Sequence, residues 1–337
     1  MKKKAIKALW KQCFNDSDDF IDLYFDLRYN NEVNIDLESG KDIIAAMQLL
    51  PYPMTFCGEI IQTSYVSGAC THPDYRSKGA MRELLSQALL RMLRTKNLIS
   101  TLIPGEPWLF NYYARMGYAP VFRYSRKEIG TASASNAIDI RVRSTVEYEE
   151  EVYLYLNRKM EERPCCLQHT VADFKVIIAE LVRTKNAIYI ATQNEAIAGV
   201  AITNQQQHTL EVQELLTDSK EIADELLYQM GQLTKSEHIT VISPPTKEIE
   251  TIILGMARII DAKSVLQLYA AAYPEEELSI ELTDEQISAN NGYYYLCNGK
   301  CMCSQERLPE THIRLNIGEL SERILAPLQP YMSLMLN

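Results

Sequence analysis

The residues of this 337-residue chain that are best suited to chemistry form a short basic turn, Arg76-Ser77-Lys78-Gly79-Ala80. Before the turn, Tyr65–Thr71 has the small and β-branched residues of a buried strand, which Pro73 must stop. After it, apolar residues recur at helical spacing as far as Leu93. Backbone N–H groups at such a turn can point into one concavity at a helix N-terminus, where the helix dipole also favours an anion. The pattern therefore predicts a pyrophosphate-binding turn.

Glycine content and local charge both favour an anionic ligand at this turn. Gly79 allows a ligand to approach the backbone closely, and Arg76 and Lys78 add positive charge. The segment 72–96 has six Lys or Arg and two acidic residues, a balance of +4, whereas the whole chain carries −10. The sequence contains neither a P-loop nor a G-x-G-x-x-G fingerprint. A solvated loop of ordinary function has similar residues, so this alternative remains open.

Two segments resemble the GCN5-related N-acetyltransferases (GNAT). His72–Ala80 is similar to the R/Q-x-x-G-x-G/A turn that holds the coenzyme pyrophosphate in that family, and Tyr113–Pro120 is similar to the later signature that closes the coenzyme cleft. Met81 occupies a position where most members of the family have Gly or Ala. A large apolar residue at this position is typical of the enhanced-intracellular-survival branch. The resemblance covers the whole chain, but specific motifs lie only in its first third.

The resemblance implies that acetyl-CoA is the co-substrate. The implied coenzyme-binding residues are Ala69, Cys70, Thr71, Arg76, Ser77, Lys78, Gly79, Ala80 and Met81. Backbone N–H groups of the Ala69–Thr71 strand would polarise the thioester carbonyl, as an oxyanion hole does. Tyr113 matches the tyrosine that protonates the departing thiolate, although Tyr113 could instead be a packing aromatic.

The resemblance also implies a base and an acceptor pocket. The base would be the terminal carboxylate on Asn337, whose ordinary pKa of about 3.3–3.7 must be raised by burial. A terminal segment that only pins domains together is an equal alternative for the apolar residues Pro330–Asn337. Two N-terminal helices would line the acceptor pocket. The pocket candidates are Trp10, Phe20, Tyr24 and Asp26.

The elements that position these residues are predicted from periodicity. Two short helices are expected between Ala5 and Tyr29. The other elements expected in this region are strands at 42–50, 54–62, 64–71 and 98–103, with a tight turn at 62–63, and helices at 80–93 and 110–116. A strand, helix and parallel strand in this order place the basic turn at the carboxyl ends of the strands, where α/β sheets bind ligands.

The chain is long enough for two or three domains. The small, polar segment Thr131–Ala137 is the best linker. We predict an α/β and α+β fold class. Residues 1–137 are expected to form an acetyl-CoA-binding GNAT domain, 138–250 a degenerate GNAT-like copy, and 251–337 an α+β domain that resembles sterol carrier protein. The copy is expected to be degenerate because Leu216–Glu221, around the start of its helix at 218–232, has two acids and no glycine, so a phosphate would be repelled there.

Composition limits the compartment and the partners. The chain has no long apolar run and no signal-peptide pattern, so a cytoplasmic protein is expected, with no membrane partner. Its eight cysteines fit free thiols. The cluster Cys297, Cys301 and Cys303 has poor spacing for a metal, and none is expected. The acidic net charge argues against nucleic acid and is compatible with a cationic amine.

These inferences predict an N-acetyltransferase that moves an acetyl group from acetyl-CoA to a primary amine of a small molecule or peptide. The amine would attack directly, with no covalent enzyme intermediate. The alternative is a non-catalytic acyl-CoA-binding or sensing protein, and a lipid-binding role for the last domain is a further possibility. Members of the resembled branch assemble into oligomers, so a homo-oligomer is expected.

Overall fold

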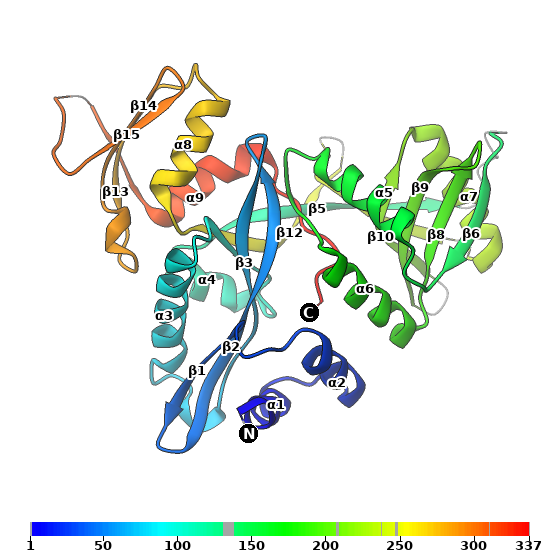
Figure 1. Cartoon of the computed structure of the whole chain (residues 1–337), viewed down its shortest axis with the longest axis horizontal. Helices are drawn as coiled ribbons and strands as arrows, with labels where there is room; N and C mark the ends of the chain where they lie inside the picture. Colours follow the sequence, from blue (N-terminus) through cyan, green and yellow to red (C-terminus); the bar gives the residue numbers. More distant parts are fainter. Residues whose placement is uncertain are drawn as a thin grey trace. The chain divides into compact units, whose positions relative to one another are not determined.

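The computed structural model describes residues 2–130, 138–206, 209–236, 238–246, 249–309 and 311–336. The predicted linker Thr131–Ala137 and the predicted base Asn337 lie outside these residues. The chain folds into two compact units, one made of Met1–Phe122 and Leu254–Pro330 and the other of Arg123–Ile253 and Tyr331–Leu336 (Figure 1). The predicted division into three domains remains a prediction.

The first unit begins as a twisted sheet with helices on both faces. Its helices are α1 (Lys2–Cys13), α2 (Asp18–Leu27), α3 (Ala80–Arg94) and α4 (Pro107–Ala114). Its strands are β1 (Asn34–Ser39), β2 (Asp42–Phe56), β3 (Glu59–Thr71), β4 (Ile99–Leu102), β12 (Thr251–Ile259) and the start of β5 (Ala119–Gly130). The sheet order is β1-β2-β3-β4-β12, with β3 and β4 parallel. The predicted βαβ unit from β3 through α3 to β4 is therefore confirmed.

The predicted strand 54–62 and the turn at 62–63 are wrong, because β2 and β3 form one long hairpin. The chain reverses at Cys57 and Gly58, which both have positive φ, and Phe56 pairs with Glu59. Pro51 and Pro53 lie inside β2 although proline usually ends a strand. Pro51 and Pro53 are two residues apart, so the N–H groups that they lack would lie on the same side of β2. Strand β1 pairs with β2 only as far as residue 48, so the two prolines remove no hydrogen bond to β1.

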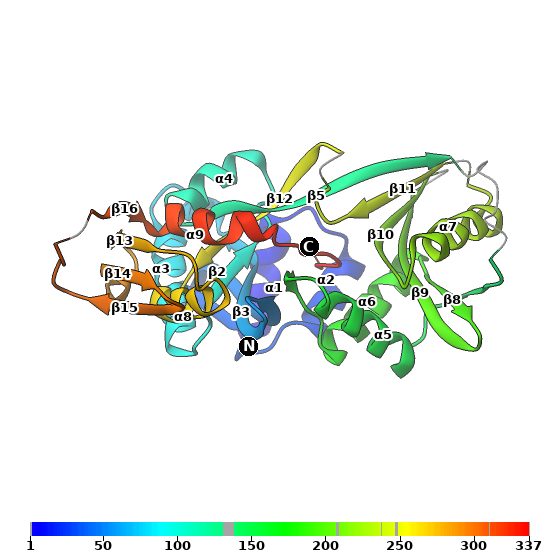
Figure 2. The same cartoon turned by 90° about the horizontal axis from the view of Figure 1, so that it is seen from above.

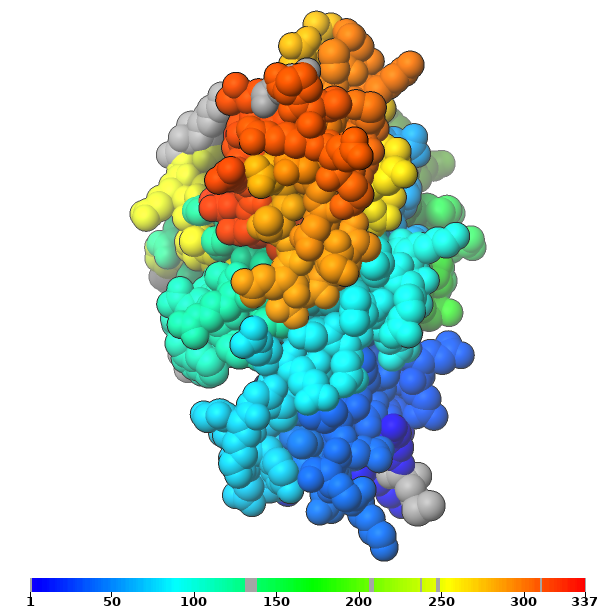
Figure 3. All heavy atoms as spheres, turned by 90° about the vertical axis from the view of Figure 1, so that its left-hand side faces the viewer, coloured from blue at the N-terminus to red at the C-terminus, as the bar shows by residue number. Residues whose placement is uncertain are grey.

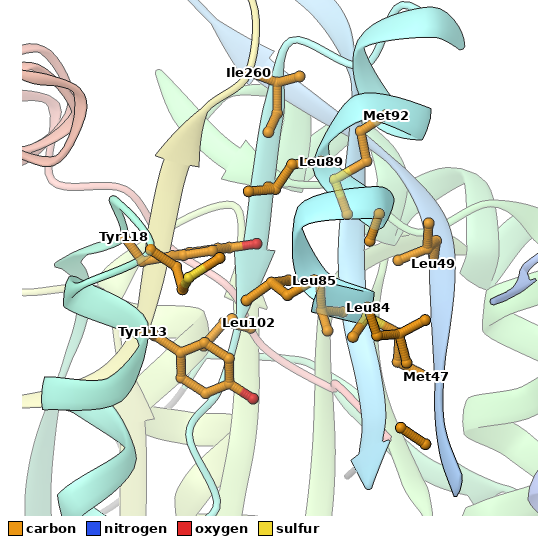
Figure 4. Close-up of a cluster of buried hydrophobic side chains, with 14 of the residues drawn as sticks. Met47, Leu49, Leu84, Leu85, Leu89, Met92, Leu102, Tyr113, Tyr118 and Ile260 are labelled. Carbon is orange, nitrogen blue, oxygen red and sulfur yellow. The ribbon is translucent and has the colours of Figure 1, made fainter. Parts of the chain in front are cut away.

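Alternate residues of the hairpin face opposite layers of the first unit. Met47 and Val66 belong to the apolar cluster under α3, which buries Leu84 and Leu85 against them (Figure 4). Their neighbours Gln48 and Ser67 instead reach the aromatic residue Tyr24 of α2 through hydrogen bonds. The period-2 geometry of a strand requires this division, so α3 and the N-terminal helices cover different faces of the sheet.

The segment after β12 adds a small α+β layer to the same unit. It contains α8 (Ala262–Ala272), β13 (Leu278–Thr283), β14 (Gly292–Cys297), β15 (Lys300–Ser304), β16 (Ile313–Asn316) and α9 (Ile317–Leu325). The sheet order is β15-β14-β13-β16, and only the β13–β16 pair is parallel. Figure 3 shows this segment, in orange, packed on the cyan residues of the α3 region. Ser86 Oγ of α3 donates to Gln286 Oε1 at 2.6 Å across this contact.

A buried ion pair joins this layer to the first sheet. Arg258 of β12 donates to both carboxylate oxygens of Asp284, at 2.8 and 2.9 Å, and both side chains are fully buried. Asn290 Nδ2 also donates to Asp284, at 2.9 Å. At Gly117, whose φ is +84°, an added Cβ would lie 2.4 Å from Arg258 Nη1. The guanidinium therefore requires glycine at this turn.

The second unit is a sheet with helices on both faces (Figure 2). Its helices are α5 (Glu150–Glu161), α6 (Val171–Thr184) and α7 (Lys220–Thr234). Its strands are β6 (Arg141–Thr145), β7 (Cys165–Leu167), β8 (Ile188–Gln193), β9 (Ala196–Gln206), β10 (Thr209–Thr217) and β11 (His238–Ser243). Ile190 packs with α5 and α6, and its neighbour Ala191 packs with α7. Thr170 caps α6 by accepting the Asp173 N–H with its side chain.

No helix in the described ranges is long and apolar enough to cross a membrane.

We expect Asp284→Asn to destabilise the first unit by about 3 kcal/mol, because it leaves the Arg258 charge buried without its counter-charge. The matched control is Glu281→Gln, since Glu281 pairs with Arg314, whose side chain is 78% exposed. That change should cost less than about 1 kcal/mol. Urea unfolding measures both. Equal small losses would contradict the assignment of stability to the buried pair.

Candidate active site

The predicted pyrophosphate turn joins β3 to α3 through a short 3-10 turn, Pro73–Tyr75. Helix α3 begins on Gly79, whose φ is +88°, and no side chain caps it. Its first internal hydrogen bond runs from the Glu83 N–H to the Gly79 carbonyl. The amides of Ala80 to Arg82 therefore have no acceptor within the described residues, as expected for an uncapped helix end. Ser77 also has positive φ, +61°, so the turn can gather N–H groups around an anion.

The surroundings of these amides are open and positively charged. An added Cβ at Gly79 would have no atom within 4 Å, so the backbone is accessible there. Arg76 and Lys78 are exposed, and the Lys78 ammonium lies 5.5 Å from the Tyr75 ring centre. Ala80 and Met81 instead direct their side chains into the α3 core, so only their amides are available to a ligand. The arrangement can bind a diphosphate through backbone N–H groups and two cations.

Strands β3 and β4 share a ladder over only three residue pairs, from Thr63 opposite Ile99 to Tyr65 opposite Thr101. Beyond Tyr65, β3 continues to Thr71 with no β4 partner along it. An edge of unpaired backbone groups is a template for an extended ligand that hydrogen-bonds to main chain. This edge leads directly to the basic turn.

A β-bulge directs the amides of this edge. Gly68 and Ala69 together oppose the single residue Met47, because Ala46 pairs with Cys70 and Gln48 with Ser67. The His72 N–H donates to Ile44 in β2 at 2.8 Å. Successive backbone N–H groups of a strand point to opposite sides. The Cys70 N–H therefore points toward β2, and the N–H groups of Ala69 and Thr71 point away from it. Of the three predicted carbonyl-binding amides, these two face the edge that lacks a β4 partner.

Tyr113 of α4 lies in the α3 core cluster and is 7% exposed. Figure 4 shows its ring beside Tyr118 and Leu85, and the Tyr113 and Tyr118 ring centres are 5.8 Å apart. Burial raises the pKa of Tyr113 well above its ordinary value, with smaller contributions from Tyr118 and Tyr112. The phenol therefore keeps its proton at neutral pH, but proton transfer to a thiolate of ordinary pKa about 8–9 is unfavourable. A hydrogen bond to the thiolate is the easier role.

Three of the four predicted acceptor-pocket residues lie together in a buried aromatic group. The Trp10 and Tyr24 ring centres are 4.6 Å apart, and those of Phe20 and Tyr24 are 6.3 Å apart. Tyr24 Oη donates to Ser67 Oγ at 2.8 Å. Asp26 lies apart from them, because its carboxylate is 71% exposed and pairs with Lys3. A role in acceptor binding remains a prediction for all four.

Gly68 is a site residue that the sequence reasoning missed. Its φ is +59°, and an added Cβ would lie 2.0 Å from the Trp10 ring and 2.7 Å from Gln48 Oε1. Gln48 is fully buried and donates to Asn34 Oδ1 at 3.2 Å. A lone glycine within a strand pattern signals a bulge or a close approach, so the sequence did carry this clue.

The second unit has a helix in the corresponding place, but its N-terminus is occupied. Ser219 caps α7 by accepting the Ile222 N–H at 3.3 Å. Asp218 carries a carboxylate beside the cap and accepts a hydrogen bond from Tyr155 Oη at 3.1 Å. Negative charge and a satisfied cap both disfavour a phosphate. The reading of the second unit as a degenerate copy remains a prediction.

The segment that precedes Asn337 is held on the second unit by a buried network. Tyr331 exchanges two backbone hydrogen bonds with β7, at 2.9 and 3.0 Å. Glu214, 1% exposed, accepts Ser333 Oγ and forms an ion pair with Arg163 at 2.6 Å. The segment is thus anchored rather than frayed, whereas the role of Asn337 remains a prediction.

In the described ranges, no group of three or more His, Cys, Asp or Glu side chains is placed to hold a metal ion. Cys297, Cys301 and Cys303 are free thiols.

Comparison with known families identifies the N-terminal part of the chain. Residues 2–121 match the family described as acetyltransferase (GNAT) domain. The matched range includes the basic turn, the β3 bulge and Tyr113. The chain therefore carries a GNAT-type acyltransferase domain. No curated protein sequence matches the chain.

Solved structures with similar folds cover nearly the whole chain. A probable N-acyltransferase from Enterococcus faecalis has a TM-score of 0.79 at 15% identity, over 95% of this chain and 86% of its own. A GCN5-related N-acetyltransferase from Anabaena variabilis has 0.75 at 17%, over 98% and 96%. Eis1 from Mycobacterium abscessus has 0.74 at 14%, over 96% and 87%. At these identities the similarity shows a mixed α/β GNAT-like fold.

We expect Gly68→Ala to destabilise the first unit by about 3 kcal/mol, because overpacking against Trp10 adds to the strain of positive φ. Gly40→Ala is the matched control, since Gly40 has φ +65° and nothing within 4 Å of an added Cβ. It should lose about 1 kcal/mol from strain alone. Urea unfolding of both variants checks this, and equal losses would show that the Trp10 contact adjusts freely.

Proposed function

We propose that this protein is an N-acetyltransferase that transfers the acetyl group of acetyl-CoA to a primary amine. The observation that carries the proposal is the uncapped start of α3, with accessible backbone at Gly79 and two cations beside it. An acidic chain with a positively charged turn at this position is suited to an anionic coenzyme. The GNAT match over residues 2–121 supports the choice of an acyl-CoA.

The residues present fit the coenzyme at its two polar parts. The amides at the start of α3, together with Arg76 and Lys78, would hold the pyrophosphate. The unpaired edge of β3 would bind the extended arm, and the amide N–H groups of Ala69 and Thr71 would donate hydrogen bonds to the thioester carbonyl. When bound, acetyl-CoA supplies an activated acyl group with a thiolate as leaving group.

In the proposed reaction, the amine nitrogen attacks the thioester carbonyl directly, and the C–N bond forms as the C–S bond breaks. Donors fixed before the reaction stabilise the developing oxyanion without reorganising. Tyr113, the predicted general acid, would stabilise the departing thiolate by donating a hydrogen bond, and the released thiolate would take its proton from solvent. The terminal carboxylate on Asn337 would take the proton that the amine loses.

The finer assignment is also proposed. We infer an enhanced-intracellular-survival type enzyme whose second unit is a degenerate copy and whose last segment resembles sterol carrier protein. The α+β layer of β13–β16 with α8 and α9 supports the last point. The acceptor would be a primary amine of a small molecule or peptide. A cationic acceptor molecule is compatible with the acidic net charge of the chain. A homo-oligomeric assembly belongs to the same proposal.

The second candidate is a non-catalytic acyl-CoA-binding protein. The burial of Tyr113 favours it, because a phenol with a strongly raised pKa is a poor proton donor to a thiolate. Two measurements separate the candidates. Calorimetry with acetyl-CoA tests binding, and release of free coenzyme thiol with a panel of polyamines, aminoglycosides and peptides tests turnover. Binding without thiol release supports a sensor, and absence of both contradicts either function.

We expect Gly79→Ala to weaken acetyl-CoA binding at least about tenfold, because the new Cβ occupies the space through which a phosphate reaches the backbone. Gly58→Ala is the matched control. Gly58 has φ +81°, close to the +88° of Gly79, and neither has an atom within 4 Å of an added Cβ. Both variants should lose similar stability, so calorimetry on the folded proteins isolates the phosphate contact. Equal affinities would contradict binding at this turn.

We expect Tyr113→Phe to lower kcat by about 100-fold or more, since it removes a donor to the leaving group, and to leave the Kd for acetyl-CoA within about twofold. Tyr112→Phe is the control and should keep normal turnover. The raised pKa of Tyr113 means that this phenol stays protonated up to pH 10, so it should cause no loss of rate between pH 8 and 10. Unchanged kcat in Tyr113→Phe would exclude the assigned role.

A further inference from the structure

Two cysteines far apart in the sequence meet beside the basic turn. Cys13 is the last residue of α1, and Cys70 lies in β3 next to the bulge. Both are free thiols, and each thiol shifts the pKa of the other. Cys13 Sγ also donates to the Thr71 carbonyl at 3.3 Å. Cys70 is buried, whereas Cys13 is partly exposed and can be reached from solvent.

The surroundings make the two thiols unequal. The hydrogen bond from Cys70 lowers the pKa of Cys13 to about 6, with further lowering by the Arg76 guanidinium and by His72, while burial opposes this. Arg76 is fixed nearby because its Nε donates to the Thr71 carbonyl at 3.2 Å. The same thiol contact, followed by burial, raises the pKa of Cys70 well above its ordinary value. Cys13 is thus the nucleophile of the pair, and Cys70 is a protonated partner.

We propose that Cys13 and Cys70 are a hydroperoxide-sensitive thiol pair that closes to a disulfide between α1 and β3. In the first step the Cys13 thiolate attacks the peroxide oxygen, the O–O bond breaks, and Cys13 sulfenic acid and hydroxide form. In the second step the Cys70 sulfur attacks the Cys13 sulfur and water leaves with the Cys70 proton. Two thiols are oxidised by two electrons, and one hydrogen peroxide becomes two waters.

The position of Cys13 permits this closure. A disulfide needs an S–S distance of about 2.05 Å, so the two sulfurs must approach each other to this distance. Cys13 ends α1, and residues 14–17 that follow it are in neither helix nor strand. The end of the helix can therefore shift toward β3 without breaking an internal element. Acetyl transfer is not needed for this chemistry, so the inference does not rest on the proposed function.

The expected rate advantage depends on pH. A thiol of pKa about 6 is about 90% thiolate at pH 7, against about 3% for an ordinary thiol of pKa about 8.5. Its lower basicity reduces the nucleophilicity of each thiolate about tenfold. Cys13 should then react with peroxide about twofold faster than an ordinary thiol at pH 7, and about tenfold faster at pH 6. The discriminating experiment therefore belongs at pH 6.

The test uses the full chain in a Cys57→Ser background, because Cys57 shares the tryptic peptide 42–76 with Cys70. Reduced protein receives a few equivalents of hydrogen peroxide at pH 6, is blocked with N-ethylmaleimide, and is digested without reductant. We expect peptide 12–28, which contains Cys13, linked to peptide 42–76, with two titratable thiols lost and both restored by dithiothreitol. The same protein carrying Cys13→Ser should lose the link and keep Cys70 reduced.

Cys297 is the internal control, because it is the exposed cysteine in the described ranges and would react first if access alone decided. Oxidation of Cys297 before Cys13 overturns the proposal, as does conversion of Cys13 to sulfinic acid while Cys70 stays a thiol. A second measurement is the alkylation rate of Cys13 with iodoacetamide across pH. Its midpoint should lie near 6 and rise in Arg76→Gln, and a midpoint near that of an ordinary thiol also overturns the proposal.

Discussion

A helix that begins on glycine leaves its first amides without acceptors, and the candidate site depends on this. In α3 the chain reaches Gly79 with positive φ, so no side chain at the N-cap can satisfy the N–H groups that follow. The helix dipole adds to their partial positive charge. The apolar face of α3, which includes Leu84 and Leu85, is buried against Met47 and Val66 of the sheet, and this packing fixes the helix in place. Packing therefore holds in place an end whose hydrogen bonds are left open for a ligand.

The second unit has a helix, α7, in the place that corresponds to α3, but the N-terminus of α7 is capped by a side chain. Ser219 replaces the glycine and caps α7 with its own hydroxyl, and Asp218 adds negative charge beside it. The difference is a few side chains and not the fold. Function must therefore be argued from the site, and similarity of fold alone would have assigned the same role to both units.

Buried charges hold together segments that are distant in sequence. Arg258 and Asp284 connect β12 to the α+β layer, and Arg163 and Glu214 support the C-terminal segment of the second unit. A buried pair contributes little net stability compared with an apolar pair, but loss of one partner is costly. Such pairs therefore impose one arrangement of the segments. The glycine at position 117, which the Arg258 guanidinium requires, follows from the same constraint.

The sequence by itself determined local features: the helical period of α3, the strand before it, the glycine at the turn and the positive charge around it. These depend on residues within a few positions of one another, so their pattern is visible along the chain. The hairpin was mispredicted because Pro51 and Pro53 are normally read as a strand end, and only the absence of β1 beside them makes them acceptable.

Only the tertiary structure decided which distant residues meet. Cys13 and Cys70, or Gly68 and Trp10, are more than fifty positions apart, and nothing in their local sequence indicates contact. Their proximity follows from α1 packing on the hairpin, and the pKa values of the two thiols and the need for glycine in β3 follow from that packing. Local free energies set the elements, whereas burial and electrostatics between elements set the chemistry of their side chains.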